Sequence, residues 1–373
     1  MGSLDDSEVS SGIIPSEVFP LLHKLAGKWP DVLDALDVTW RPLKGAMTNH
    51  IYECQWPGGS GRVGEQQRKA LVRIYGDSVD ILFKREDEVR IFEFVSRKGQ
   101  GPRLLGRFPN GRVEEFIHAR TLTAADLRDP GISARIAAKM WEFHRLDLPE
   151  SHEPKLWERL RDWLQKAEKL CSPQSMQEFH MKRLESEIRE AESTIPEPGD
   201  VIGFCHNDLQ YGNIMHNDAT DALTIIDYEY ASYNPVAFDI ANHFCEMAAD
   251  YHTESPHRLD YAKYPGNLHC CSHSADEDER RRFIEAYLDS SGSKASRGDV
   301  DTLLLRVDLY ELASHLHWGL WGIISVPISD IDFDFLEYAR QRFQRYDERK
   351  RELWPRTMKK YPLESVSYIL RSK

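Results

Sequence analysis

The sequence predicts an α+β fold with two lobes, a small N-terminal lobe made of an antiparallel sheet plus one helix, and a larger, mainly helical C-terminal lobe. Short β-branched and aromatic runs separated by turn residues dominate 38–117, whereas apolar residues recur at helical spacing through most of the chain after 123. The 373 residues are enough for about two domains. We therefore expect a disordered, acidic tail over 1–15, a first lobe over 16–118 and a second over 119–373.

The small lobe begins with apolar residues at helical spacing over 16–36, which predict two short helices interrupted at Pro30. Three extended runs then predict strands, at 38–40, 51–54 and 70–75. Helical spacing over 79–98 predicts the single inserted helix. Asn110-Gly111 stands between two further extended runs, and this dipeptide is a strong signal for a hairpin.

The C-terminal lobe is predicted from longer helical patterns, which cover 132–143, 156–170, 176–193 and 303–324. Residues 252–282 are polar, His-rich and acidic, and we interpret them as an exposed connection. Within this connection, 269–273 carries two adjacent cysteines between histidines. We interpret that stretch as a surface loop, because adjacent cysteines rarely present both sulfurs to one tetrahedral metal ion.

Composition excludes several classes of partner. Lys and Arg number 48 against 61 Asp and Glu, a net charge of −13, which argues against a nucleic-acid binder or a polybasic membrane adaptor and against polyanions as the main partner. The longest apolar candidate, 318–328, is about half the length needed to span a bilayer, so we expect no stable membrane insertion. Six scattered cysteines favour a cytoplasmic protein. Homodimerisation stays open.

Polar residues concentrate in two loops. The first lies between the apolar runs 201–205 and 223–226, and the second follows the run 223–226. Phosphoryl transfer needs a carboxylate near the acceptor hydroxyl, an amide oxygen nearby and a second carboxylate that holds Mg²⁺. Asp208, Asn213 and Asp227 supply these types, with the five-residue step from Asp208 to Asn213 found in protein-kinase catalytic loops. A helix cap or a turn residue would explain either part alone, but not both at this spacing.

These residues resemble a known family. The strings 206–213, 226–234 and 238–246 are similar to the signature of the choline/ethanolamine kinases, relatives of the aminoglycoside phosphotransferases and protein kinases, and the resemblance extends over 20–345. It implies a bilobal, protein-kinase-like fold. It also implies transfer of the γ-phosphoryl group of ATP to choline with Mg²⁺, the first step of the CDP-choline route to phosphatidylcholine.

The resemblance further implies roles for matching residues. Asp208 would accept the choline hydroxyl proton, Asn213 and Asp227 would bind Mg²⁺, and Gln210 would lie beside the transferred phosphate. Arg73 would bind phosphate and pair with Glu88 of the inserted helix. The remaining ATP-binding positions would be the nucleotide-covering turn and the hinge that receives adenine, namely Lys44, Gly45, Ala46, Met47, Thr48, Asn49, His50, Glu115, Phe116, Ile117 and Thr121.

The predicted helix 303–324 offers an observation that is independent of the family. Its aliphatic residues fall on one arc, and Trp318 and Trp321 fall on the opposite side, where they need a second apolar neighbour or a ligand. Burial against another helix is the usual explanation, but a cationic acceptor favours ligand binding because ring faces attract quaternary ammonium. The resemblance implies a choline-binding set of Tyr230, Glu246, Tyr251, Trp318, Trp321, Phe333 and Tyr338, beside Asp208.

Three alternatives stay open at this point. An ethanolamine kinase, or a dual choline/ethanolamine kinase, would handle a cation with three N–H donors and would favour more acceptors, whereas Tyr251 and Cys245-Glu246 look more like the choline-preferring branch. An aminoglycoside phosphotransferase-like enzyme would not need the two tryptophans. A pseudokinase would normally have lost Asp208, Asn213 or Asp227, and all three are present.

Overall fold

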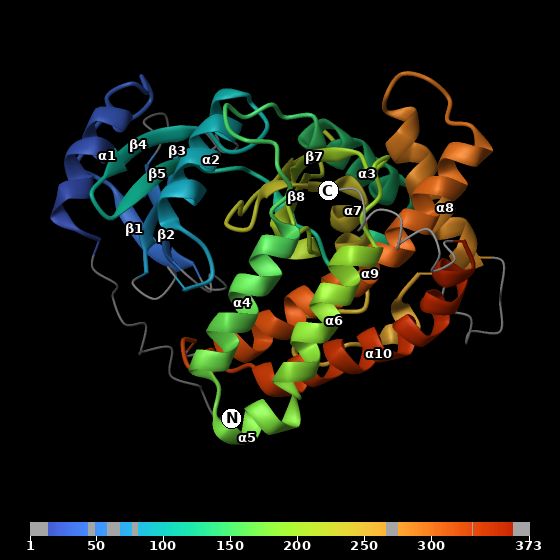
Figure 1. Cartoon of the computed structure of the whole chain (residues 1–373). Helices are drawn as coiled ribbons and strands as arrows, with labels where there is room; N and C mark the ends of the chain where they lie inside the picture. The colour runs from blue at the N-terminus through green and yellow to red at the C-terminus, as the bar shows by residue number, and fades with distance from the viewer. Residues whose placement is uncertain are drawn as a thin grey trace, which may run out of the picture. The chain divides into compact units, whose positions relative to one another are not determined.

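The computed structural model describes residues 14–43, 49–57, 68–76, 81–265, 275–329 and 331–360 (Figure 1). The chain divides into two compact units, one comprising 1–80 with 84–119 and the other 81–83 with 120–373. Three sequence-based expectations lie outside the described residues: the tail as far as residue 13, the Lys44–Thr48 part of the predicted nucleotide-covering turn, and the 269–273 stretch.

The first unit contains a five-stranded antiparallel sheet in the order β1-β2-β3-β5-β4. Its strands are β1 (Thr39–Leu43), β2 (Asn49–Trp56), β3 (Arg68–Tyr75), β4 (Leu104–Phe108) and β5 (Gly111–Glu115). The predicted hairpin at Asn110-Gly111 is confirmed, since β4 and β5 pair across this turn. Only glycine fits at 111, because a Cβ there would lie 2.2 Å from the Arg73 carbonyl oxygen.

Two α-helices accompany this sheet, α1 (Phe19–Ala26), which follows the short 3₁₀ helix η1 (Ser16–Val18), and α2 (Arg85–Arg97). The buried face of η1 and α1 joins one hydrophobic core with the sheet residues Val72 and Val113. Ile14 is only 2% exposed in the same core, so packing begins inside the segment predicted as a disordered tail.

The second short helix predicted before residue 36 was wrong. The Asp34 carboxylate accepts the backbone N–H of Leu36, a local turn that competes with helix formation. Leu33 and Leu36 are 82% and 67% exposed, so packing does not favour a helix there.

The second unit is mainly helical. Its α-helices are α3 (Pro130–His144), α4 (Leu156–Leu170), α5 (Pro173–Glu178), α6 (Met181–Thr194), α7 (Val236–Glu246), α8 (Ala275–Asp289), α9 (Arg297–Ser325) and α10 (Phe335–Lys360). Helix α9 packs against α4, α7 and α10. It is buried on every side from Leu309 to Ser325, so its aliphatic stripe and its tryptophan face both have neighbours.

Two small antiparallel sheets surround the polar segment of this unit, with strand orders β10-β7 and β6-β8-β9. Their strands are β6 (Arg120–Thr121), β7 (Ile202–Cys205), β8 (Ile214–Asn217), β9 (Ala222–Ile225) and β10 (Ser232–Pro235). The chain leaves β7 at Cys205 to form the loop with Asp208, and it leaves β9 at Ile225 to reach Asp227. The sheets therefore position both carboxylates.

The prediction that 252–282 is one exposed connection was partly wrong. The segment contains the 3₁₀ helix η5 (Tyr261–Lys263) and the first turns of α8. Tyr264 is 2% exposed and donates a hydrogen bond to Glu311 of α9 at 3.1 Å. This anchor depends on a distant helix, so the local sequence pattern does not reveal it.

Within the described residues, no helix combines the length and the apolar character required to cross a membrane.

Candidate active site

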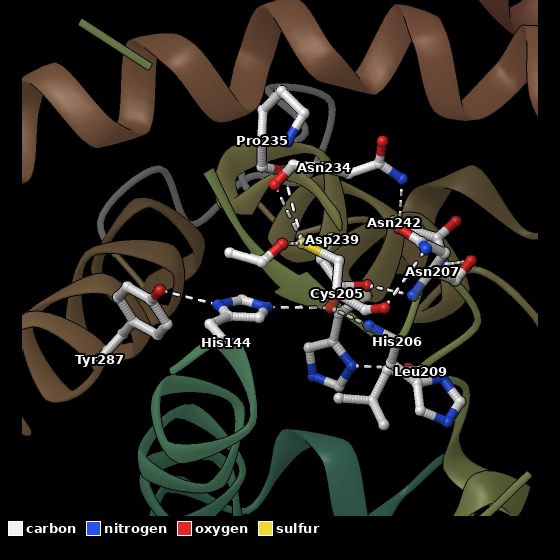
Figure 2. Close-up of polar contacts among 12 residues, drawn as sticks. His144, Cys205, His206, Asn207, Leu209, Asn234, Pro235, Asp239, Asn242 and Tyr287 are labelled. Carbon is white, nitrogen blue, oxygen red and sulfur yellow. Dashed lines mark hydrogen bonds and ion pairs between the residues drawn. The ribbon is translucent and has the colours of Figure 1, made fainter. Parts of the chain in front are cut away.

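One buried carboxylate holds the loop that carries Asp208. Asp239 of α7 is 1% exposed and accepts the backbone N–H groups of His206 at 2.8 Å and Asn207 at 2.7 Å (Figure 2). His144 is hydrogen-bonded to the same carboxylate at 2.9 Å and to the Tyr287 hydroxyl at 2.7 Å. Burial opposes ionisation, but the hydrogen bond from His144 and neighbouring charges lower the pKa of Asp239, so the loop is held by an anion.

Asp208 and Asn213 are joined by two hydrogen bonds. The Asn213 Nδ2 donates to the Asp208 carbonyl oxygen at 2.8 Å and to its Oδ2 at 2.9 Å. Desolvation first, and then the charges of Glu246 and Glu229, raise the pKa of Asp208 well above its ordinary value, against the Asn213 hydrogen bond that lowers it. A raised pKa gives this carboxylate a greater affinity for a proton than an exposed aspartate has.

Asp227 lies beside Asn213 because the Ile226 N–H donates to the Asn213 carbonyl oxygen at 3.0 Å. Its φ of +67° is in the left-handed region, where a non-glycine residue is uncommon. Among the described residues, neither the Asp227 carboxylate nor the Asn213 Oδ1 has a hydrogen-bond partner. Carboxylate and amide oxygens are the ligand types that Mg²⁺ prefers, and the backbone hydrogen bond from Ile226 to Asn213 joins the two segments that carry them.

Gln210 turns back on its own loop. Its Oε1 accepts the Gly212 N–H at 2.6 Å and caps η4 (Tyr211–Asn213), the single turn that leads to Asn213. The side chain therefore stabilises the turn, in addition to any role toward a phosphate.

The arginine of the first unit belongs to a chain of buried charges. Arg73 Nε and Arg112 Nε both donate to Glu114 Oε1 at 2.7 Å, and Arg112 Nη1 donates to Glu88 Oε1 at 2.7 Å. The prediction that Glu88 pairs with Arg73 was wrong, because Glu88 binds Arg85 and Arg112 instead. Burial raises the pKa of Glu114, but the two arginines more than offset this and lower it, so the bridging carboxylate stays ionised.

The other predicted ATP-binding residues that the structure describes are Asn49, His50, Glu115, Phe116, Ile117 and Thr121. Asn49 is 8% exposed and His50 is exposed at the start of β2. Contacts that involve the predicted hinge are the Glu115–Arg103 ion pair at 3.0 Å, the Lys69 ammonium 4.9 Å from the Phe116 ring centroid, the Ala119 N–H bonded to the Ile117 carbonyl oxygen at 2.9 Å, and Thr121 paired with Met215. These contacts leave their proposed roles untested.

Five aromatic side chains of the second unit, Tyr230, Trp318, Trp321, Phe333 and Tyr338, form what we call the aromatic cluster. Ring centroids are 5.6 Å apart for Tyr230 and Trp318, and 5.5 Å apart for Trp318 and Trp321. Trp321 lies 6.3 Å from Phe333 and 5.8 Å from Tyr338, both with edge-on geometry. The structure thus brings together aromatic residues that are distant in the sequence.

The polar edges of the two tryptophans are occupied by protein groups. Trp318 Nε1 donates to Asn242 Oδ1 at 2.6 Å, and Trp321 Nε1 donates to the Tyr230 hydroxyl at 3.0 Å. Asn242 Nδ2 in turn donates to the Asn207 carbonyl oxygen at 3.2 Å, so one fully buried amide joins the aromatic cluster to the Asp208 loop. Neither Asn242 nor Asp239 was among the predicted site residues, and their place in the motif 238–246 was the available signal.

Glu246 is not a free anion. Its Oε1 accepts a hydrogen bond from Arg342 Nη2 at 2.6 Å, and its Oε2 accepts one from the Tyr251 hydroxyl at 2.6 Å. Arg342 was not among the predicted site residues, although it stands four residues after Tyr338 on one helix face. The role of Glu246 in choline binding therefore stays a prediction, for a carboxylate whose two oxygens are both engaged by other side chains.

The second unit thus holds an aspartate hydrogen-bonded to an asparagine, a second aspartate with no hydrogen-bond partner among the described residues, and the aromatic cluster. A sequence model described as choline/ethanolamine kinase matches residues 40–347. The chain belongs to the choline/ethanolamine kinase family.

Relatives within the choline/ethanolamine kinase family differ in similarity to this chain. A protein named probable choline kinase 2 from Arabidopsis thaliana is 54% identical over 333 residues, covering 89% of this chain and 91% of the relative. A probable ethanolamine kinase from the same plant is 33% identical over 359 residues, covering 92% and 88%. The crystal structure of a choline kinase from Cryptosporidium parvum matches with a TM-score of 0.76 at 27% identity, over 94% of this chain and 98% of that one, which confirms the predicted protein-kinase-like fold.

Proposed function

We propose that this protein transfers the γ-phosphoryl group of ATP to the hydroxyl of choline, giving phosphocholine and ADP. The observation that carries the proposal is the Asp208–Asn213 pair, in the same unit as the aromatic cluster and as Asp227, whose carboxylate has no hydrogen-bond partner among the described residues. On this account the phosphocholine enters the CDP-choline route to phosphatidylcholine. The four free thiols among the described residues, Cys54, Cys171, Cys205 and Cys245, agree with a cytoplasmic site of action.

The proposed reaction breaks the bond between the γ-phosphorus and the oxygen that stays with ADP, and forms a bond from that phosphorus to the choline oxygen. Asp208 accepts the hydroxyl proton and Asn213 holds the Asp208 carboxylate in position. Asn213 and Asp227 would hold Mg²⁺, which supplies positive charge to the phosphate oxygens. In the first unit, Arg73 would bind phosphate, with its guanidinium oriented by Glu114.

Choline is favoured over ethanolamine by the surroundings of the aromatic cluster. A trimethylammonium group has no N–H to donate and is attracted to ring faces, by about 0.5–2 kcal/mol per ring. A primary ammonium must exchange its water for acceptors, and the nearby carboxylate of Glu246 is already paired with Arg342. The higher identity to probable choline kinases than to a probable ethanolamine kinase supports the same choice.

A coupled ADP-release assay with choline tests the proposal. Asp208→Asn should lower kcat by about 10²- to 10⁴-fold, the usual contribution of general-base catalysis. Asp162→Asn makes the same chemical change on the exposed face of α4, where the aspartate side chain is 52% exposed, and should leave kcat unchanged. Thermal unfolding of both variants checks that they fold. Unchanged turnover in folded Asp208→Asn, or no choline-dependent ADP release by the parent, rejects the proposal.

A further inference from the structure

A buried ion pair, formed by Arg342 and Glu246, contacts the aromatic cluster at Tyr338. Arg342 of α10 and Glu246 at the end of α7 are 0% and 2% exposed, and their Nη2 and Oε1 atoms are 2.6 Å apart. The second carboxylate oxygen accepts the Tyr251 hydroxyl at 2.6 Å. The charge of Glu246 is therefore balanced, and both of its oxygens are engaged, by the protein itself.

Arg342 also contacts the cluster directly. Its Nε and Nη2 donate to the Tyr338 hydroxyl at 3.0 Å and 2.8 Å, and its guanidinium carbon lies 5.0 Å from the centroid of that ring. Tyr338 in turn lies 5.4 Å from Phe333 and 5.8 Å from Trp321. A change at Arg342 is thus transmitted both to Glu246 and to the rings.

This ion pair has different consequences for the two candidate amines. The trimethylammonium group of choline binds ring faces and needs no hydrogen-bond acceptor. The hydrogen bonds that already engage Glu246 therefore weaken choline binding little. Ethanolamine loses water from three N–H donors, and donors left without acceptors are heavily penalised in a site shielded from water. The tryptophan N–H groups offer no compensation, because they are donors and are already bound to Asn242 and Tyr230.

We propose that Arg342 is a specificity-determining residue, which keeps Glu246 engaged and so biases the site toward a quaternary ammonium over a primary one. This inference rests on the proposed function and assigns a role to a residue that would not itself contact the reacting atoms. Arg342 therefore acts as a positioning residue, and its signature is a change in amine selectivity rather than a general loss of activity.

The test compares kcat/KM for choline and for ethanolamine. Arg342→Met should free Glu246 and lower the choline-to-ethanolamine ratio about tenfold or more, mainly through a lower KM for ethanolamine, since a hydrogen bond to a charged group is worth at least that factor. The double variant Arg342→Met with Glu246→Gln removes the freed charge as well, and should return most of the way to the parental ratio. Arg342→Lys, which keeps the cation, should retain choline preference.

A second variant protects the test against misfolding of Arg342→Met. Tyr251→Phe removes only the hydroxyl that engages Glu246 Oε2, and it should shift the ratio in the same direction by a smaller factor. A ratio that stays within twofold of the parent in every folded variant overturns the inference. A parent that phosphorylates neither amine contradicts the proposed function instead, so the two failures are distinguishable.

Discussion

At the scale of single residues, the structure has a row of buried charged side chains where the sequence predicted one arginine–glutamate pair. We call this row the relay; its members, in order, are Arg73, Glu114, Arg112 and Glu88. The family resemblance predicts Arg73 and Glu88 as charged partners, but the sequence does not reveal that Glu114 bridges Arg73 and Arg112. The reason is geometric: Glu114 is on β5, the strand that pairs with β3, and strand pairing depends on the fold. The motif therefore predicts which charged residues belong to the site. Which of them form ion pairs depends on the register between β3 and β5.

Glu114→Gln tests this relay. Removing the central charge leaves Arg73 and Arg112 buried beside each other without their shared anion, which should cost about 3 kcal/mol of unfolding free energy. We also expect a raised KM for ATP. Glu93→Gln is the matched control, because Glu93 pairs with Arg107 at a site where the side chains are 29% and 55% exposed, and it should cost less than about 1 kcal/mol. Equal losses in both variants, measured by urea unfolding, contradict the relay.

At the scale of elements, α9 shows what a pattern can and cannot reveal. Helical spacing predicted a helix over 303–324, and the structure has Arg297–Ser325. The tryptophan face needed a neighbour, but only the fold identifies it as the residues around Phe333 and Tyr338, which come from a later part of the chain. The failed helix before residue 36 is the converse case, because a local aspartate turn prevailed where tertiary packing was weak.

Two glycines next to the tryptophans set the spacing between α9 and α10. A Cβ at Gly319 would lie 2.5 Å from the Phe343 ring, and one at Gly322 would lie 2.9 Å from the Phe335 carbonyl oxygen. Gly319→Ala should therefore destabilise the protein by about 1–3 kcal/mol through overpacking. Gly298→Ala in the same helix, where the nearest atom is 3.7 Å away, should be neutral or slightly stabilising because alanine favours helices. If Gly319→Ala and Gly298→Ala have the same Tm, the close approach of Phe343 to Gly319 does not exclude a larger side chain, and the prediction is contradicted.

At the scale of the whole molecule, buried histidines predict sensitivity to acid. Burial, only partly offset by the hydrogen bond with Glu311, lowers the pKa of His315 to about 4 from an ordinary 6.5. The unfolded chain therefore binds this proton more tightly than the folded chain does. As a result, the free energy of unfolding is at its full value above pH 6.5 and decreases as the pH falls from 6.5 toward 4. Arg342 and Arg345 face the same histidine and act in the same direction.

Urea unfolding at pH 7 and pH 5 measures this effect. The parent should lose stability on acidification, and His315→Gln should lose less because the titrating group is gone. His152→Gln, at a side chain that is 56% exposed, should behave like the parent. An unchanged pH dependence in folded His315→Gln rules out His315 as a contributor.

The net charge of −13 is also a property of the whole molecule, and it does not prevent ATP binding. The proposed phosphate ligand, Arg73, lies among buried charges whose balance is local, so the surface charge need not describe that site. Composition argues against nucleic acids as partners, but it does not show where a small anion would be bound.

The most direct measurement is ³¹P NMR of the parent protein with choline, ATP and Mg²⁺. The account predicts that the γ-phosphate signal of ATP is replaced by phosphocholine and ADP in equal amounts, and that Asp208→Asn slows this conversion by about 10²- to 10⁴-fold. Persistence of ATP in the parent sample, or its conversion to inorganic phosphate without phosphocholine, would contradict it.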